Sequence, residues 1–248
     1  MTSGPPAVRL DRVSKAFGDR PVLRDVSLEI AAGTAFCVLG RSGEGKSVML
    51  KHMIGLVKPD TGRVFVSGED ITDLSGRALA PVRRRMGFLF QEAALFDSIS
   101  VGENVAFPLR RHTRLPEAGI VERARARLAD VDLADAFDEM PADLSGGMRK
   151  RAGLARAMAL DPDILLVDEP SAGLDPITSR EIDDLLIGLR RRGTTLVVVT
   201  HNIPSARAIG DELAMLHDGR LVARGTVAEL DRNPDPLVQA FMRSAGGG

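Results

Sequence analysis

Four short, continuously apolar runs recur along the chain, and each ends in a polar or glycine-rich segment. Apolar runs of this length, bounded by turn residues, are typical of strands that are buried on both faces of a parallel sheet. Ligands bind at the carboxyl ends of such strands. We therefore expect the residues that follow the four runs to form one site; the runs are 35–39, 86–90, 164–167 and 195–199.

Apolar and polar residues alternate near both ends of the chain. From 213 to 225 the alternation surrounds Asp218-Gly219, a dipeptide typical of a two-residue hairpin turn. Before Gly33 the alternation predicts a small antiparallel sheet; its apolar positions are Val8, Leu10, Val13, Val22, Val26, Leu28 and Ile30.

The pattern becomes helical between 91 and 162, most clearly over 122–128 and 149–160. This stretch predicts a helical subdomain inserted into an α/β core. Another helix is predicted from Ser47 to Val57, where apolar residues recur at helical spacing and indicate core packing rather than a cofactor site.

Composition narrows the class of protein. The 33 basic and 34 acidic residues give a net charge of −1, which argues against binding nucleic acid through overall basicity. We predict that the single cysteine, Cys37, is a small buried side chain, because it lies inside an apolar run. No run approaches the roughly 18 apolar residues that span a bilayer. Trp and Tyr are absent, so we expect phenylalanine to supply any ring that stacks on a ligand.

A glycine-rich loop follows the first apolar run and reads GRSGEGKS, which matches the phosphate-binding pattern G-x-x-x-x-G-K-[ST]. It lies between a predicted strand and a predicted helix, as this motif requires. Its backbone N–H groups would surround phosphates, Lys46 would reach the β- and γ-phosphates, and the Ser47 hydroxyl would ligate Mg²⁺. The predicted ATP-binding residues of this segment are Gly40, Arg41, Ser42, Gly43, Glu44, Gly45, Lys46, Ser47 and Val48.

The other three runs also end in residues suited to phosphate chemistry. Asp168 would hold Mg²⁺, and Glu169 would act as the general base for an attacking water. His201 would contact the γ-phosphate or that water. Gln91 would sense the metal or the nucleotide and relay its state to a neighbouring surface.

A second helix start with anion-binding character reads LSGGMRKR. Ser145 would cap the helix, two glycines would allow close approach, and Arg149 and Arg151 would add positive potential. This segment belongs to the helical subdomain, at a distance from the strand ends of its own chain. We therefore predict a head-to-tail homodimer in which one copy contacts the ATP of the other; the residues predicted to act in trans are Ser145, Gly146, Gly147, Met148 and Asp175.

Together, the loop GRSGEGKS, LSGGM, ILLVDEP, SAGLD and the histidine after VVVT resemble the motifs of ABC transporter ATPases in order and spacing. The resemblance covers about residues 7–235. It implies an α/β fold: a P-loop NTPase (RecA-like) core with an N-terminal antiparallel β subdomain and an inserted α-helical subdomain. We expect one ABC ATPase domain over 1–248, divided into a core (7–91 and 160–235), a helical subdomain (92–159) and a C-terminal tail (236–248).

A narrower resemblance rests on FQEAALFDSISVGENVAFPLR and on the methionine in LSGGM. These segments look like the ATPase of Mla/Mce-type phospholipid transporters. The resemblance implies ATP and Mg²⁺ as cofactors, an integral membrane permease touched by Phe96 and its neighbours, and an Mce-domain lipid-binding protein. It places the chain at the cytoplasmic face of the inner membrane, with no nucleic-acid partner.

Three positions depart from the common family pattern. Phe17 stands where many relatives have the tyrosine that stacks on adenine, Met148 replaces a glutamine, and Asn202 replaces an aspartate after His201. Other interpretations stay open: an ATPase for another small solute, a soluble ABC protein that acts on DNA or ribosomes, or a module that holds ATP without turnover.

Overall fold

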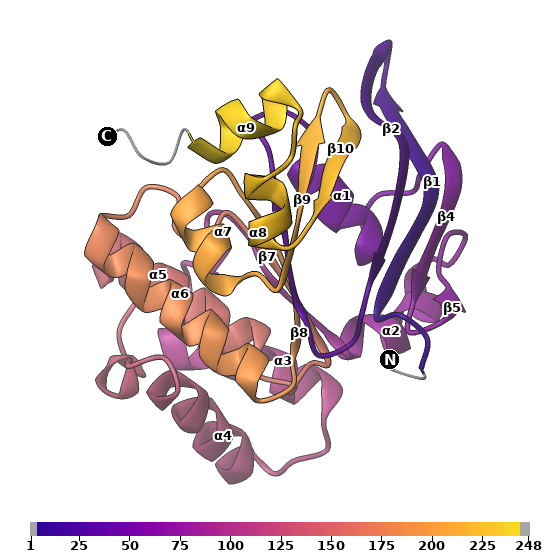
Figure 1. Cartoon of the computed structure of the whole chain (residues 1–248). Helices are drawn as coiled ribbons and strands as arrows, with labels where there is room; N and C mark the ends of the chain where they lie inside the picture. Colours follow the sequence, from indigo (N-terminus) through magenta and orange to yellow (C-terminus); the bar gives the residue numbers. More distant parts are fainter. Residues whose placement is uncertain (1–3, 244–248) are drawn as a thin grey trace.

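The computed structural model describes residues 4–243, and its strands form two sheets (Figure 1). The larger sheet has six strands in the order β10-β9-β3-β8-β7-β6. The four predicted buried strands are confirmed, and they are parallel neighbours in this sheet. They are β3 (Ala35–Leu39), β6 (Met86–Leu89), β7 (Ile164–Asp168) and β8 (Thr195–Thr200).

The predicted C-terminal hairpin completes the edge of this sheet. Strand β9 (Glu212–His217) runs parallel to β3, and β10 (Arg220–Gly225) returns antiparallel to β9. Asp218 and Gly219 form the turn between them with φ angles of 47° and 75°, the left-handed pair that a two-residue hairpin turn requires.

The predicted N-terminal antiparallel sheet is also confirmed, with the strand order β2-β1-β4-β5. Leu10 lies opposite Leu28 and Val13 lies opposite Val26, so the apolar positions share one face. Two further strands of this sheet were not predicted. The sheet comprises β1 (Val8–Phe17), β2 (Arg20–Ile30), β4 (Thr61–Val66) and β5 (Glu69–Asp70).

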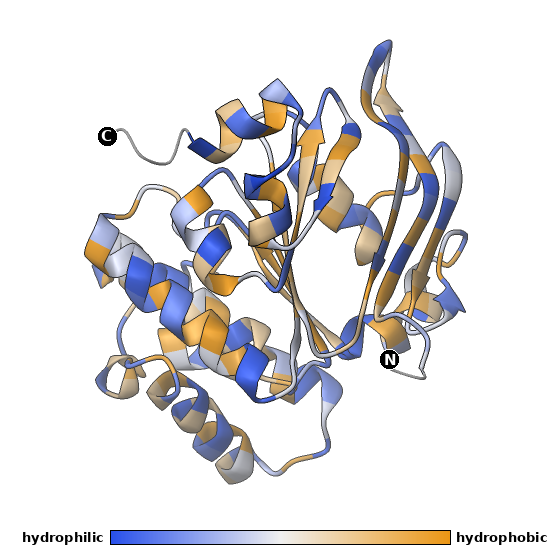
Figure 2. Ribbon diagram, viewed as in Figure 1, coloured by the Kyte–Doolittle hydropathy of each residue, from blue (hydrophilic) through white to orange (hydrophobic). Residues whose placement is uncertain are grey.

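Helix α1 (Lys46–Met53) packs between the two sheets, and its Met49 and Leu50 join one core with both of them. Successive residues of β3 point to opposite sides: Phe36 belongs to this core, whereas Cys37 belongs to a second core on the other face. Figure 2 shows central strands that are largely hydrophobic. Cys37 is buried as predicted, and burial raises the pKa of its thiol.

Helix α1 ends four residues earlier than the periodicity predicts. Gly55 has a φ of 67°, and its N–H donates to the carbonyl of His52. This left-handed glycine terminates the helix. Arg83 then donates to the carbonyls of Ile54 and Gly55 at 3.1 and 2.9 Å. Arg83 therefore binds the carboxyl end of α1.

The other face of the large sheet is covered by helices, which lie at the lower left of Figure 1. These helices are α3 (Val101–His112), α4 (Glu117–Ala129) and α5 (Gly146–Ala157), with α6 (Pro176–Arg191) beside them. The predicted helical character of 91–162 is confirmed: α4 includes the predicted stretch 122–128, and α5 begins directly after Ser145, the predicted cap.

The remaining elements are short. They comprise α2 (Ala80–Arg84), α7 (Ile203–Ile209), α8 (Val227–Asp231), α9 (Pro236–Arg243) and the 3₁₀ turns η1 (Gly76–Leu79), η2 (Ala134–Ala136) and η3 (Pro141–Asp143). Helix α9 occupies the first part of the expected tail, because Val238 and Met242 fall on one helical face and are buried. The rest of that tail, 244–248, lies outside the described residues.

No helix within residues 4–243 has the length and apolar character needed to cross a membrane. The division of the chain into a core and a helical subdomain at the predicted boundaries stays a prediction.

Candidate functional site

The glycine-rich loop connects the carboxyl end of β3 to α1 and packs closely against two neighbouring strands. Gly43 and Gly45 have φ angles of 84° and 101°, which favour glycine. A Cβ on Gly45 would lie 2.8 Å from the carbonyl oxygen of Val22, and one on Gly40 would lie 2.7 Å from that of Leu216. Strands β2 and β9 therefore hold the loop on two sides.

Lys46 opens α1 and folds back across the loop. Its Nζ donates to the carbonyl oxygens of Gly40 and Arg41 at 2.9 and 3.1 Å. The same atom lies 3.2 Å from Glu169 Oε1 at the end of β7. The ammonium thus connects the loop to the neighbouring strand end, at the position where a phosphate would need a positive charge.

Ser47 and Asp168 meet at the same edge of the sheet. The Ser47 hydroxyl donates to Asp168 Oδ1 at 2.8 Å. Burial raises the pKa of Asp168, and the hydrogen bond from Ser47 partly opposes that rise. A hydroxyl and a buried carboxylate are oxygen ligands of the kind that Mg²⁺ prefers, so the pair fits this ion.

Glu169 is held at both its backbone and its side chain. Its φ of 46° is unusual for a residue other than glycine, and its N–H donates to the carbonyl of Val199 on β8. The carboxylate oxygen Oε2 accepts from Thr200 Oγ1 at 3.1 Å and lies 2.9 Å from Nδ1 of His201. The side chain has few accessible rotamers left, as a positioned base requires.

Gln91 follows β6 at this edge, and its side chain is exposed. Its main-chain carbonyl accepts a hydrogen bond from Lys150 of α5, a contact that the sequence did not suggest. A role for the Gln91 side chain in holding metal stays a prediction.

Phe17 ends β1 with half of its surface exposed (52%). It borders a cavity of about 320 Å³ with Gly43, Lys46, Ser47 and Val48 of the phosphate loop. Arg20 lines the same cavity, because it pairs with Phe17 across the turn between β1 and β2. The antiparallel sheet was predicted, but Arg20 was not among the predicted site residues.

Glu44 turns its side chain inward at the tip of the loop. Its carboxylate accepts from the N–H of Arg41 at 3.2 Å and lies 2.9 Å from Nδ1 of His217 on β9. A cavity of about 380 Å³ lies beside this pair, and its lining includes Arg41, Ser42 and His201. No pattern in the sequence placed His217 here.

The second predicted helix start lies at the amino end of α5. Ser145 caps it by accepting from the N–H of Met148 at 3.2 Å, and Ser145 and Gly146 are exposed. Gly147 touches α6, since a Cβ there would lie 2.4 Å from Thr178 Cγ2. Asp175 caps α6 by accepting from the N–H groups of Ile177 and Thr178.

The residues predicted to act in trans are thus brought together. The amino ends of α5 and α6 pack against each other through Gly147 and Thr178. Asn202 caps α7 by accepting from the N–H of Ser205, so its amide does what an aspartate would do there.

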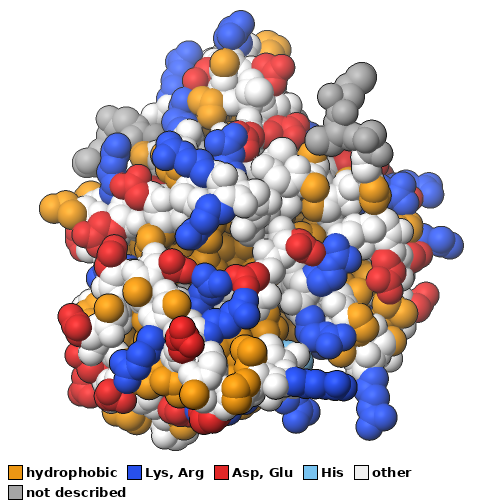
Figure 3. All heavy atoms as spheres, turned by 90° about the horizontal axis from the view of Figure 1, so that it is seen from below, with side chains coloured by type: hydrophobic (Ala, Val, Ile, Leu, Met, Phe, Trp, Pro, Cys, Tyr) orange, Lys and Arg blue, Asp and Glu red, His pale blue; other side chains and the backbone are white. Residues whose placement is uncertain are grey.

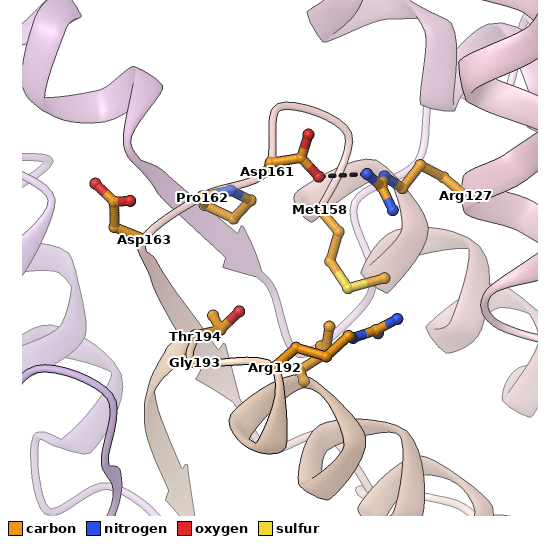
Figure 4. Close-up of a pocket in the computed structure, with 9 residues that line it drawn as sticks. Arg127, Met158, Asp161, Pro162, Asp163, Arg192, Gly193 and Thr194 are labelled. Carbon is orange, nitrogen blue, oxygen red and sulfur yellow. Dashed lines mark hydrogen bonds and ion pairs between the residues drawn. The ribbon is translucent and has the colours of Figure 1, made fainter.

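A different cavity, of about 310 Å³, lies at the opposite edge of the sheet (Figure 4). Its lining includes Asp163 and Thr194, which directly precede β7 and β8, together with Arg127, which bonds to Asp161. Figure 3 shows hydrophobic side chains in a hollow among Lys and Arg on the lower face. The cavity of Figure 4 is lined by none of the predicted site residues.

Comparison with known proteins agrees with this geometry. A family model described as ABC transporter matches residues 23–172. The intermembrane phospholipid transport system ATP-binding protein MlaF of Escherichia coli (strain K12) is 40% identical over 237 residues, which cover 95% of this chain and 88% of that protein. The probable ribonucleotide transport ATP-binding protein mkl of Mycobacterium tuberculosis (strain H37Rv) is 41% identical over 237 residues. They cover 95% of this chain and 66% of that longer protein.

A solved structure of a dimeric ATP-binding cassette, in a post-hydrolysis state bound to ADP and Pi, superposes with a TM-score of 0.83. It is 35% identical in sequence, and the match covers 88% of this chain and 98% of that one. The predicted fold class is confirmed by this similarity.

Proposed function

The chain belongs to the ABC transporter family of ATPases, and from this premise we propose that it hydrolyses ATP to power phospholipid transport across a cell envelope. The observation that carries the proposal is the convergence of Lys46, Ser47, Asp168 and Glu169 at one edge of the parallel sheet. The similarity to phospholipid transport ATP-binding proteins over nearly the whole chain supports the cargo.

In the proposed reaction, a water oxygen bonds to the γ-phosphorus while the bond to the oxygen that bridges the β- and γ-phosphates breaks. Glu169 takes a proton from that water, and ADP and phosphate leave. His201 and Thr200 fix the Glu169 carboxylate by bonds to the same oxygen. Lys46 supplies positive charge to the phosphates, which a preorganised site stabilises best in the transition state.

Ser47 and Asp168 would hold Mg²⁺, with Gln91 as a further ligand. The ion would neutralise phosphate charge. Phe17 would stack on the base, since its exposed ring borders the phosphate loop.

We propose a head-to-tail homodimer as the working unit. The exposed amino end of α5 offers unpaired N–H groups and a positive dipole, which suit the γ-phosphate held by a second copy. The dimeric cassette that this chain resembles supports the arrangement.

A surface groove beside β6 is our candidate contact for a membrane permease. Phe96 and Phe107 are 46% and 49% exposed, and their ring centroids lie 5.1 Å apart. They line a groove of about 290 Å³ together with Met86 and Phe88. Exposed apolar side chains gathered in this way mark interaction surfaces. The chain would therefore sit at the cytoplasmic face of the inner membrane as a peripheral subunit.

The competing cargo is a small solute, because relatives of equal similarity are named for ribonucleotide transport. The test is to purify the chain from detergent-solubilised membranes of its host and to identify the co-purifying proteins and lipids by mass spectrometry. A permease with an Mce-domain protein and enriched phospholipid would support the proposal. A permease with a solute-binding protein and no enriched lipid would overturn the cargo but leave the ATPase.

A further inference from the structure

Lys150 is a buried cation in the second turn of α5, with 6% of its surface exposed. Its ammonium donates to two main-chain carbonyls from different parts of the chain. One is the carbonyl of Gln91, which follows β6. The other is the carbonyl of Glu169, at 3.0 Å.

Both carbonyls belong to residues that the proposed reaction uses. Glu169 has a left-handed backbone conformation, which costs about 1 kcal/mol or more for a residue with a Cβ. Its N–H is held by Val199 of β8, and its carbonyl is held by Lys150. The peptide groups on both sides of the Glu169 Cα are therefore fixed, and this fixes the direction in which the carboxylate leaves the backbone.

The position of Lys150 along α5 adds a second consequence. Lys150 lies five positions after Ser145, so the two are about 7.5 Å apart along the helix axis. The exposed amino end of α5 and the backbone of Glu169 are thus connected through less than two turns of one helix.

We propose that Lys150 is a positioning residue for hydrolysis: it fixes the backbones of Glu169 and Gln91 relative to each other and to the amino end of α5. This inference rests on the proposed ATPase function. In a head-to-tail dimer, α5 would contact the partner's nucleotide at one end and its own chain's base at Lys150. Nucleotide binding at one site would then change the position of Glu169 at the other site.

Burial lowers the pKa of Lys150, while the nearby carboxylates of Glu92, Asp168 and Glu169 oppose that change. The two carbonyls that Lys150 binds come from different segments, so the donor at this position must be long and must carry several N–H groups, as Lys and Arg do. Neither a shorter polar side chain nor an apolar one can reach and satisfy two carbonyls at once.

The experiment compares three variants of the full chain with the wild type: Lys150→Met, Lys150→Arg and Arg123→Met. Arg123 is the matched control. It is a basic residue of α4 that donates a hydrogen bond to Asp161 and not to the backbone of Glu169. The measurements are kcat and KM for ATP hydrolysis, and the affinity for a fluorescent ATP analogue.

We expect Lys150→Met to lower kcat about tenfold or more, since small misplacements of a catalytic group have effects of this size. KM and analogue affinity should change by less than about twofold, because Lys150 does not contact the phosphate loop. Lys150→Arg should recover most of the lost kcat, and Arg123→Met should keep both constants.

Two results would overturn the inference. One is a Lys150→Met variant with wild-type kcat. The other is an equal loss of kcat and nucleotide affinity that Lys150→Arg does not repair, which would indicate general structural damage. A wild-type chain that hydrolyses no ATP, with or without its membrane partners, would instead refute the proposed function itself.

Discussion

Lys46 and Glu169 form a buried ion pair across the site: Lys46 Nζ lies 3.2 Å from Glu169 Oε1, and the two side chains are 5% and 9% exposed. The pair joins the residue predicted to bind phosphate to the residue predicted to activate water. A nucleotide phosphate and the Glu169 carboxylate would compete for the same ammonium. The pair therefore couples phosphate binding to the freedom of the base.

Replacing Lys46 by alanine should weaken ATP binding by tenfold to about a hundredfold, the range expected for a lost charged hydrogen bond. It should also lower the free energy of unfolding, because Glu169 loses a charged partner inside the protein. Titration with a fluorescent ATP analogue and urea unfolding measure the two effects. Lys58→Ala is the control, since Lys58 is exposed and its contact with Asp73 is a surface pair. Unchanged affinity in Lys46→Ala would contradict the assignment.

Gly147→Ala should separate the amino ends of α5 and α6. The new Cβ would lie 2.4 Å from Thr178 Cγ2, whose rotamer is fixed by the bond from Thr178 Oγ1 to Asp175. We expect a loss of about 1–3 kcal/mol in the free energy of unfolding, as for other overpacked sites, together with reduced ATP turnover.

Adding Thr178→Ser to Gly147→Ala should restore part of both losses, because serine lacks the clashing methyl but keeps the hydroxyl. Gly188→Ala on α6 is the matched control: a Cβ at that position would have no atom within 4 Å. It should raise stability by about 0.5–1 kcal/mol and leave turnover alone. A double variant no better than Gly147→Ala would show that the clash is not the cause.

Asp183 on α6 should make stability depend on pH. Burial raises the pKa of its carboxyl from 3.8 to about 6, and the hydroxyl of Ser205 partly opposes the rise. Because the folded pKa is the higher one, the contribution of Asp183 is most favourable below pH 3.8 and is lost as the pH rises through about 6. Asp183→Asn should therefore raise Tm at pH 8 by about 2–6 °C. The gain should shrink toward pH 4; a gain that is the same at both pH values would exclude this explanation.

The sequence contained enough information for the strands that carry the site. Runs such as 35–39 are apolar on both faces, so burial between two layers follows directly from their composition. Because parallel strands end at one edge, the convergence of Ser47, Asp168, Glu169 and His201 could be foreseen without coordinates.

The missed features depend on the tertiary arrangement. Strand β4 was not predicted because it is held in place by its pairing with β1. Only glycine fits at position 62 of this strand, because a Cβ there would lie 2.3 Å from the carbonyl oxygen of Arg12. Lys150 and His217 act through carbonyl and carboxylate partners that are distant in sequence. The left-handed backbone of Glu169 has no local signal, since only its tertiary contacts make it favourable.

Mixing two inactive variants tests whether a complete site needs two chains. Lys46→Ala removes the phosphate ligand, and Ser145→Arg blocks the exposed start of α5. In a head-to-tail dimer of one chain of each kind, one site pairs an intact Lys46 with an intact Ser145. Phosphate release from the mixture should therefore recover, to at most one working site per mixed dimer. A mixture as inactive as its components would contradict the arrangement.

The most direct test of the proposed chemistry is steady-state phosphate release by the wild-type chain and by Glu169→Gln, each with ATP and Mg²⁺, together with nucleotide affinity. Losing a general base lowers turnover by about 10²–10⁴-fold. We predict such a loss in Glu169→Gln, with ATP affinity equal to or higher than that of the wild type because Lys46 is freed for phosphate. Wild-type turnover in Glu169→Gln would contradict the account, since another group would then have to activate the water.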